Sequence, residues 1–384
     1  MILDGGILEK AILRKRLNRF TVECILKGRT IKAYLPNPGR LWELLLPGRP
    51  LYRRKNPSRS KIPYTVISTK RDGLPILLHT HLTNTIVEFL LKEKKIPGLE
   101  NFDLVKKEVC IGRSRFDFLL QGERCELVLE VKNCTLFGRT LAMFPDAITV
   151  RGRRHLLELS KLKEKGIDGG ILFVVWWPSA KYFLPEYHTD IDFSRDLLKV
   201  RDKILIKAIA VKLKKDLSLD TGVKELMIPW ELLEREAQDR GCYILILSIK
   251  EDCAFSVGEL GTIDFRKGYY LYIGSAKRGL TKRIARHKRR RKKLFWHIDY
   301  LRKHASFYEE LPIRTSANLE CEVATRLKEF VGWTIPGFGS SDCACESHLF
   351  GMKEDPISSS LFINMLQDFR IGKLEGTFPK VPSL

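Results

Sequence analysis

Three ionisable residues at short spacing form the first group that could do chemistry. Glu130 and Lys132 stand two residues apart in CELVLEVKNC (125–134), a run of β-forming apolar residues, so their side chains would share one strand face. Asp117 alternates with apolar residues in SRFDFLL and could lie across the sheet from Glu130. A charge on a half-buried strand face is costly unless it is paired, solvated or metal-bound. The pattern therefore allows a surface salt bridge or a metal site.

The metal-site interpretation predicts a specific reaction. Two carboxylates, Asp117 and Glu130, are the hard oxygen ligands that Mg²⁺ or Mn²⁺ prefers. Lys132 could orient a water on the metal, while the metal neutralises the charge that builds up on a phosphate. The expected chemistry is metal-dependent hydrolysis of a phosphodiester bond.

The elements that would position these residues follow a recognisable order. A helix is predicted at 81–98, three strands at 103–111, 114–122 and 125–133, a helix at 146–166 and a buried strand at 170–177. This order is similar to that of the PD-D/E-x-K nuclease fold, and Glu88 on the first helix matches its frequent extra acidic residue. The segment 181–211 is predicted to be irregular closing structure.

The N-terminal region and the composition point to a nucleic-acid partner. The first 80 residues read as short extended segments broken by Gly and Pro, which predicts a small β-barrel. The formal net charge of +22 favours a polyanion, DNA above all. No apolar run approaches the roughly 18 residues of a membrane span, and the N-terminus lacks an apolar signal-peptide core, so we expect a cytoplasmic protein without membrane contact.

Four separated motifs together resemble the sugar fermentation stimulation protein A family, over roughly residues 10 to 235: PNPGRLWELLLPG, SRFDFLL, LEVKNCTL and FPDAITVRGRRHLLEL. The resemblance implies an N-terminal OB-like domain joined to a PD-D/E-x-K nuclease-like domain that binds DNA. It places Asp117, Glu130 and Lys132 in the catalytic positions. It does not decide between DNA cleavage and gene regulation.

Basic residues around this site are candidates for DNA contacts. Arg151 and Arg154 at one helix start are predicted to grip phosphates while His155 supports the site, because phosphate contacts provide most nucleic-acid affinity. Arg115 beside Asp117 and Arg40 in PNPGR are further candidates. A merely solvated basic face is the alternative for the helix, and Pro and Gly would make the PNPGR turn without any ligand.

A second α/β unit is predicted from Gly241 onward, with GCY, GYYLYIGSA, WHIDYL, ECEVA and PGFGSSDCACESHLF as its motifs. These resemble the DUF123 branch of the GIY-YIG nucleases over roughly residues 240 to 355. The resemblance implies that Tyr243 and Tyr272 help to activate water, Arg283 stabilises phosphate charge and Glu320 holds a divalent metal. Cys242 replaces the usual Ile, and 28 residues separate the two tyrosines, more than is typical. The alternative is that both tyrosines pack as sheet aromatics.

Seven Lys or Arg residues stand among the eight of RHKRRRKK (286–293). We expect this run to continue a helix that begins near Leu280 and to contact nucleic acid, rather than to be only a solvated face. The predicted contacts are Arg286, His287, Arg289, Arg290 and Arg291.

A cysteine-rich stretch, SDCACESH, brings Cys343, Cys345 and His348 close in sequence, with Cys321 as a fourth candidate ligand for Zn²⁺. Because Cys-x-Cys is not the usual finger spacing, the sequence favours buried thiols beside a turn over a zinc site.

The fold class expected from these patterns is multidomain α/β. The predicted domains are an OB-like barrel (1–82), a PD-D/E-x-K restriction-endonuclease-like core (83–230), a GIY-YIG-like DUF123 domain (240–355) and a C-terminal extension (356–384). The predicted function is a DNA-binding, metal-dependent nuclease, with RNA as a further candidate substrate. The alternative is a non-catalytic DNA-binding regulatory protein of the sugar fermentation stimulation type.

Overall fold

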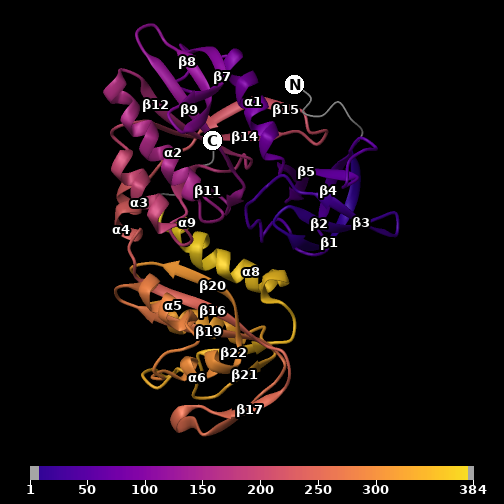
Figure 1. Ribbon diagram of the computed structural model, residues 1–384, viewed down its shortest axis with the longest axis vertical. Coiled ribbons are helices and arrows are strands. Elements are labelled where there is room, and N and C mark those ends of the chain that lie inside the picture. The colour runs from indigo at the N-terminus through magenta and orange to yellow at the C-terminus, as the bar shows by residue number, and fades with distance from the viewer. Residues whose placement is uncertain (1–7, 379–384) are drawn as a thin grey trace. The chain divides into compact units, whose positions relative to one another are not determined.

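The computed structural model describes residues 8–378, and the chain divides into two compact units between Leu233 and Glu234 (Figure 1). Both units combine helices with sheets, which confirms the predicted multidomain α/β class. Within the described part of the chain, every helix is too short or too polar to cross a lipid bilayer.

The first unit opens with a closed barrel, in agreement with the OB-like prediction. Its strands are β1 (Glu9–Asn18), β2 (Thr21–Leu26), β3 (Arg29–Tyr34), β4 (Pro50–Lys55), β5 (Tyr64–Arg71) and β6 (Leu74–Leu77). β1 pairs with β2 and β4, and a bridge between Tyr34 and Thr65 joins β3 to β5, which closes the ring. Lys27 and Gly28, both at positive φ, make the tight turn between β2 and β3.

A six-stranded sheet with the order β15-β14-β12-β9-β8-β7 forms the rest of this unit. The elements are α1 (Thr80–Lys92), β7 (Asp103–Ile111), β8 (Ser114–Gln121), β9 (Glu126–Cys134), α2 (Val150–Lys161), η1 (Leu162–Lys165), β12 (Asp168–Val175), α3 (Ile191–Val200), β14 (Leu205–Leu213) and β15 (Leu219–Glu225). A small sheet of β10 (Leu136–Phe137), β11 (Leu141–Phe144) and β13 (Tyr182–Pro185) lies between β9 and α3 in sequence. The order helix, three strands, helix, strand is as predicted.

The prediction of irregular structure at 181–211 is wrong, because this stretch contains α3 and most of β14. Asp190 is the N-cap of α3, and its carboxylate accepts a hydrogen bond from Phe193 N at 3.0 Å. β14 runs parallel to β12, and its apolar residues from Ala208 to Val211 are buried within the sheet. Both elements were missed because α3 is short and amphipathic and β14 has a mixed composition.

The segment that begins with PNPGR packs against the loop between β11 and α2, and two buried carboxyl groups, Asp146 and Glu43, lie close together there. Asp146 Oδ2 accepts a hydrogen bond from Leu41 N at 2.6 Å. Burial raises the pKa of Asp146 to about 6. Burial and the nearby charge of Asp146 raise the pKa of Glu43 to about 8. The loop motif thus has a structural role in holding the two folds together.

Glu43 should make the protein less stable as the pH rises. Its folded-state pKa of about 8 exceeds the ordinary 4.5, so its contribution to stability is full below pH 4.5 and is lost as the pH rises through 8. Between these two pH values the equilibrium constant for unfolding should rise by up to roughly tenfold per pH unit. Thermal unfolding of wild type and Glu43→Gln at several pH values checks this, since the variant should lose the slope. Parallel pH profiles for the two proteins would contradict it.

The second unit is built on an antiparallel sheet with the order β20-β16-β19-β22-β21. Its elements are β16 (Gly241–Ile249), β17 (Cys253–Ser256), η2 (Gly258–Leu260), β18 (Thr262–Phe265), β19 (Gly268–Ala276), α5 (Leu280–Lys288), α6 (His297–His304), β20 (Ser306–Arg314), α7 (Glu320–Lys328), β21 (Trp333–Thr334), β22 (Leu349–Met352), η3 (Pro356–Ser358), α8 (Ser360–Gln367), η4 (Asp368–Gly372) and α9 (Lys373–Glu375). Helix α4 (Trp230–Glu236) spans the boundary between the units.

Candidate active site

Asp117 lies at the point where β8 and β9 separate. The last residues paired on this side are Phe118 and Leu129, so Asp117 and Glu130 come next on the two strands. The ladder does not continue, and Asp117 Oδ2 instead accepts a hydrogen bond from Val131 N at 2.7 Å. Separation of the two strands therefore leaves both carboxylates at the fork between β8 and β9, while each strand stays paired with its other neighbour.

Glu130 is buried among positive and polar groups. Lys132 Nζ forms an ion pair with Glu130 Oε1, and His155 Nδ1 from α2 lies 2.7 Å from the same oxygen. Burial alone would raise the pKa of Glu130, but Lys132 and His155 outweigh it and hold the pKa below its ordinary value. The other oxygen, Oε2, is also buried, and it accepts no hydrogen bond from residues 8–378.

The environment of Asp117 has the opposite effect. Burial, followed by repulsion from Glu130, raises the pKa of Asp117 to about 6. Asn84 on α1 donates a hydrogen bond from Nδ2 to Asp117 Oδ1 at 2.6 Å. Two neighbouring carboxyl groups with pKa values pushed apart are common at reactive sites.

A cavity of about 420 Å³ contains these groups. Its lining mixes carboxylates with cations and includes the N-terminal end of α2 and part of the barrel. The charged lining residues are Arg19, Glu108, Arg115, Asp117, Glu130, Lys132, Asp146 and Arg151. Such a lining suits an anionic ligand held through a cation.

The remaining predicted residues of this unit lie in different places. Arg115 and Arg151 line the cavity, whereas Arg154 lies beside Glu158 in a separate hollow along α2. Arg40 stacks on Trp42, with its guanidinium carbon 4.7 Å from the ring centre. His155 is completely buried, so its position suits support of Glu130 rather than contact with a ligand.

The structure does not bring Glu88 together with Asp117. Glu88 is held between Lys92 and Lys107, at 2.8 and 2.9 Å, and is not part of the cavity lining. Asn84, one helical turn earlier, is the α1 residue that reaches Asp117. Asn84 was not among the predicted site residues, although its i, i+4 relation to Glu88 places both side chains on one helix face.

The predicted tyrosines of the second unit, Tyr243 and Tyr272, lie together and are buried, with ring centres 6.5 Å apart. His287 completes an aromatic group with both rings at 6.0 Å. Burial raises the pKa of each tyrosine above its ordinary value. Burial also lowers the pKa of His287, although Asp299 opposes this effect. This packing also fits the sheet-aromatic alternative.

Glu320 and Arg283 lie beside Ser275, which follows the YIG motif. Ser275 donates its hydroxyl to Glu320 Oε2, and Arg283 donates to the Ser275 carbonyl at 2.5 Å. Burial would raise the pKa of Glu320, but the nearby His348 ring and the hydrogen bond from Ser275 hold it below its ordinary value. The predicted polar residues are therefore adjacent, although both Glu320 oxygens already face neighbouring groups.

The basic run does not continue the helix, so that part of the prediction is wrong. α5 ends at Lys288, and Arg289 is extended. Lys292 turns back to donate to the carbonyls of Arg286 and His287 at 3.1 and 3.0 Å, which satisfies the helix end. Repulsion between successive cations also disfavours further helix.

Some of these cations have structural partners. Arg286 and Lys292 form ion pairs with the buried Asp299 at 3.0 and 2.8 Å, and His287 is buried against the same carboxylate. Arg289, Arg290 and Arg291 are exposed. The exposed arginines are therefore the better candidates for contacts with nucleic acid.

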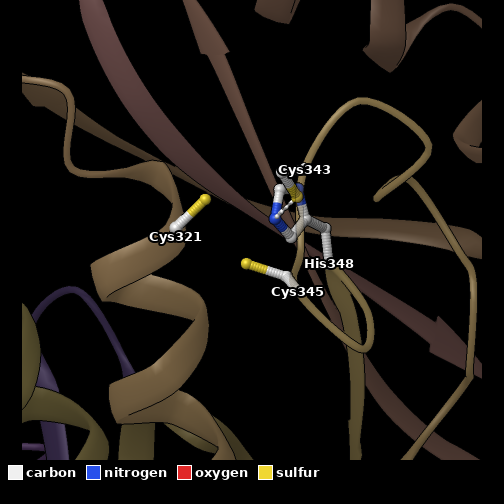
Figure 2. Close-up of side chains that lie close together, drawn as sticks. All are labelled: Cys321, Cys343, Cys345 and His348. Carbon is white, nitrogen blue, oxygen red and sulfur yellow. Dashed lines mark hydrogen bonds between the residues drawn. The ribbon is translucent and has the colours of Figure 1, made fainter.

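The four candidate zinc ligands come together, although they belong to two segments. Cys321 lies on the first turn of α7, and Cys343, Cys345 and His348 lie before β22 (Figure 2). One ligand atom from each residue lies within 4.8 Å of all the others.

Three family models match consecutive parts of the chain. They are the SfsA N-terminal OB domain at residues 15–78, the sugar fermentation stimulation protein RE domain at 81–217 and DUF123, a domain of unknown function, at 242–371. These matches confirm the resemblance to the sugar fermentation stimulation protein A family and the resemblance to DUF123.

Individual proteins match the first of the two units. The sugar fermentation stimulation protein homolog of Methanothermobacter thermautotrophicus is 38% identical over 203 residues, which cover 53% of this chain and 84% of that protein. The homolog of Methanosphaera stadtmanae is 40% identical over 244 residues, covering 59% and 99%. The solved structure of Pyrococcus furiosus SfsA in complex with Ca²⁺ is 28% identical, with a TM-score of 0.55 over 59% of this chain and 98% of that one.

Proposed function

This chain belongs to the sugar fermentation stimulation protein family, and from this premise we propose that it binds DNA and hydrolyses phosphodiester bonds with the help of a divalent cation. The proposed site is the cavity that contains Asp117, Glu130 and Lys132.

The observation that carries this proposal is the buried Oε2 of Glu130, for which the described residues provide no donor. A buried carboxylate oxygen without a partner is costly, and a cation would satisfy it. Asp117 lines the same cavity and offers a second carboxylate. The relative from Pyrococcus furiosus was solved in complex with Ca²⁺, a hard cation that takes oxygen ligands.

Asp117 and Glu130 would therefore hold Mg²⁺ or Mn²⁺, which when bound would neutralise phosphate charge and favour deprotonation of a water. Lys132 would orient the attacking water, and its ion pair with Glu130 supports this role because it keeps the ammonium beside the proposed metal ligand. His155 would hold the Glu130 carboxylate in position through the contact of its Nδ1 with Glu130 Oε1. Arg115 and Arg151 would contact the flanking phosphates.

DNA is the substrate that we propose, and RNA is tested beside it. The net charge of +22 provides electrostatic affinity for a polyanion. The barrel contributes Arg19 to the cavity lining, so a strand entering the site would also contact the OB-like fold. Affinity of this kind is salt-dependent and has little sequence preference.

The decisive experiment measures cleavage of labelled single- and double-stranded DNA and RNA with Mg²⁺, Mn²⁺ or EDTA. The proteins are wild type, Glu130→Ala, Glu320→Ala and, as a matched control, Glu126→Ala, an exposed glutamate on the same strand. Metal-dependent cleavage lost only in Glu130→Ala supports the first site, and loss only in Glu320→Ala assigns the chemistry to the second unit. Binding without cleavage in every condition favours the non-catalytic regulator.

Cation affinity should fall as the pH is lowered through about 6. Asp117 has a pKa of about 6 and must lose its proton to bind a cation, so each pH unit below that value should weaken Mg²⁺ binding by about tenfold. Calorimetric titration of Mg²⁺ at pH 5, 6 and 7.5 tests this. Asp117→Asn should bind weakly and without this pH dependence. Equal affinity of the wild type at all three pH values would contradict the assignment of Asp117.

A further inference from the structure

The cysteine cluster of the second unit does not behave as a set of core thiols. Cys321 is exposed and Cys343 and Cys345 are only half-buried, whereas His348 is buried beneath them. The expectation of buried thiols beside a turn is therefore wrong. Three sulfur atoms and one imidazole nitrogen therefore lie together near the protein surface, and packing in the core does not account for this arrangement.

We propose that Cys321, Cys343, Cys345 and His348 form a structural Zn²⁺ site. Figure 2 shows the sulfurs of Cys321 and Cys345 directed towards a common space that Cys343 and His348 also border. The four ligand atoms lie within 4.8 Å of one another. In a tetrahedral site with Zn–S bonds of about 2.3 Å, ligands are about 3.8 Å apart, so small side-chain movements suffice.

The orientation of His348 supports this site independently. Its Nε2 lies 3.4 Å from Cys343 Sγ, on the side of the cluster, and its Nδ1 lies 3.4 Å from Glu320 Oε1. A ligating histidine usually donates its other ring N–H to a carboxylate, which sets the tautomer and strengthens the ligand. Glu320 is thus a positioning residue for the proposed zinc ligand.

The position in the fold shows what the ion would stabilise. The connection from β21 to β22, residues 335–348, has little secondary structure, and Phe338 packs against Tyr272 with ring centres 6.2 Å apart. Zn²⁺ would tie this loop to the first turn of α7. Four protein ligands leave no open position, which is typical of structural rather than catalytic zinc.

This assignment bears on the second predicted nuclease centre. Glu320 directs one oxygen towards His348 and accepts a hydrogen bond from Ser275 with the other. Changing Glu320 would therefore disturb the proposed zinc site as well as any catalytic site in this unit. The zinc proposal does not depend on cleavage activity, and it requires that zinc content be measured in Glu320→Ala before any loss of cleavage by that variant is interpreted.

Metal content of the full-length chain, purified without chelator, provides the first test. Elemental analysis should find one zinc per chain in wild type and in Cys253→Ser, which changes an exposed cysteine outside the cluster. Cys345→Ser should retain less than about a tenth of that amount. The Co²⁺-substituted wild-type protein should show visible bands of tetrahedral cobalt and charge-transfer bands of thiolate ligands. This readout applies even if Cys345→Ser does not fold.

A second test addresses the positioning role of Glu320. Glu320→Gln should keep one zinc per chain but release it to a competing chelator about 10- to 100-fold more readily. Removal of zinc should lower the melting temperature of the wild type, and added Zn²⁺ should restore it. The proposal is overturned if purified wild type holds no stoichiometric zinc, if zinc persists after Cys321, Cys343 and Cys345 are all changed to Ser, or if two of these cysteines form a disulfide in freshly prepared protein.

Discussion

Lys132→Ala should lower the rate of DNA cleavage by about 100- to 1000-fold while leaving DNA affinity nearly unchanged. The ammonium of Lys132 pairs with Glu130 in the cavity, and both side chains are mostly buried. Its charge therefore acts on the reacting groups, whereas one cation among many contributes little to binding. Single-turnover cleavage and fluorescence anisotropy, measured on the same labelled duplex, separate the two effects.

Two controls make this result interpretable. Lys106→Ala removes an exposed lysine of β7 in the same sheet and should change neither cleavage nor affinity. Lys132→Gln keeps most of the side-chain length, so it distinguishes loss of charge from loss of packing beside the buried Glu130. A Lys132→Ala protein that is folded and cleaves at the wild-type rate would refute the assignment of this residue.

Neutralising Arg289, Arg290 and Arg291 together should weaken DNA binding by roughly 100-fold at low salt and flatten its salt dependence. All three are exposed after the end of α5, whereas Arg286 and Lys292 are engaged with Asp299. If each arginine contacts one phosphate, the slope of log K against log salt should become less steep by about 2 to 3. Anisotropy titrations of Arg→Gln variants at several salt concentrations measure both quantities.

The comparison requires a variant with the same change in net charge. Replacing Lys161, Lys163 and Lys165 by Gln removes three exposed cations from the first unit and should lower affinity only slightly. An unchanged salt slope in the arginine variant would mean that the basic run is only solvated. Equal effects of the two triple variants would mean that net charge, rather than this segment, determines binding.

The sequence by itself determined the features that depend on local pattern. A run of β-forming residues predicts the strand, and the two-residue spacing places Glu130 and Lys132 on one face of β9; the order of helices and strands around them is the predicted one. The barrel could be predicted because Gly and Pro mark its turns. The motifs that carry the family resemblance are continuous segments of sequence, so they could be recognised without the fold. The family matches confirm this resemblance.

Only the tertiary structure decided which side chains meet, because contacts between distant segments leave no periodic trace in the sequence. Asn84 rather than Glu88 reaches Asp117 because the packing of α1 sets which helical turn faces the site. The basic run does not extend α5, because Lys292 pairs with Asp299 of α6 and donates to the end of α5. Cys321 joins Cys343, Cys345 and His348 because α7 and the loop before β22 pack together, which sequence spacing could not show.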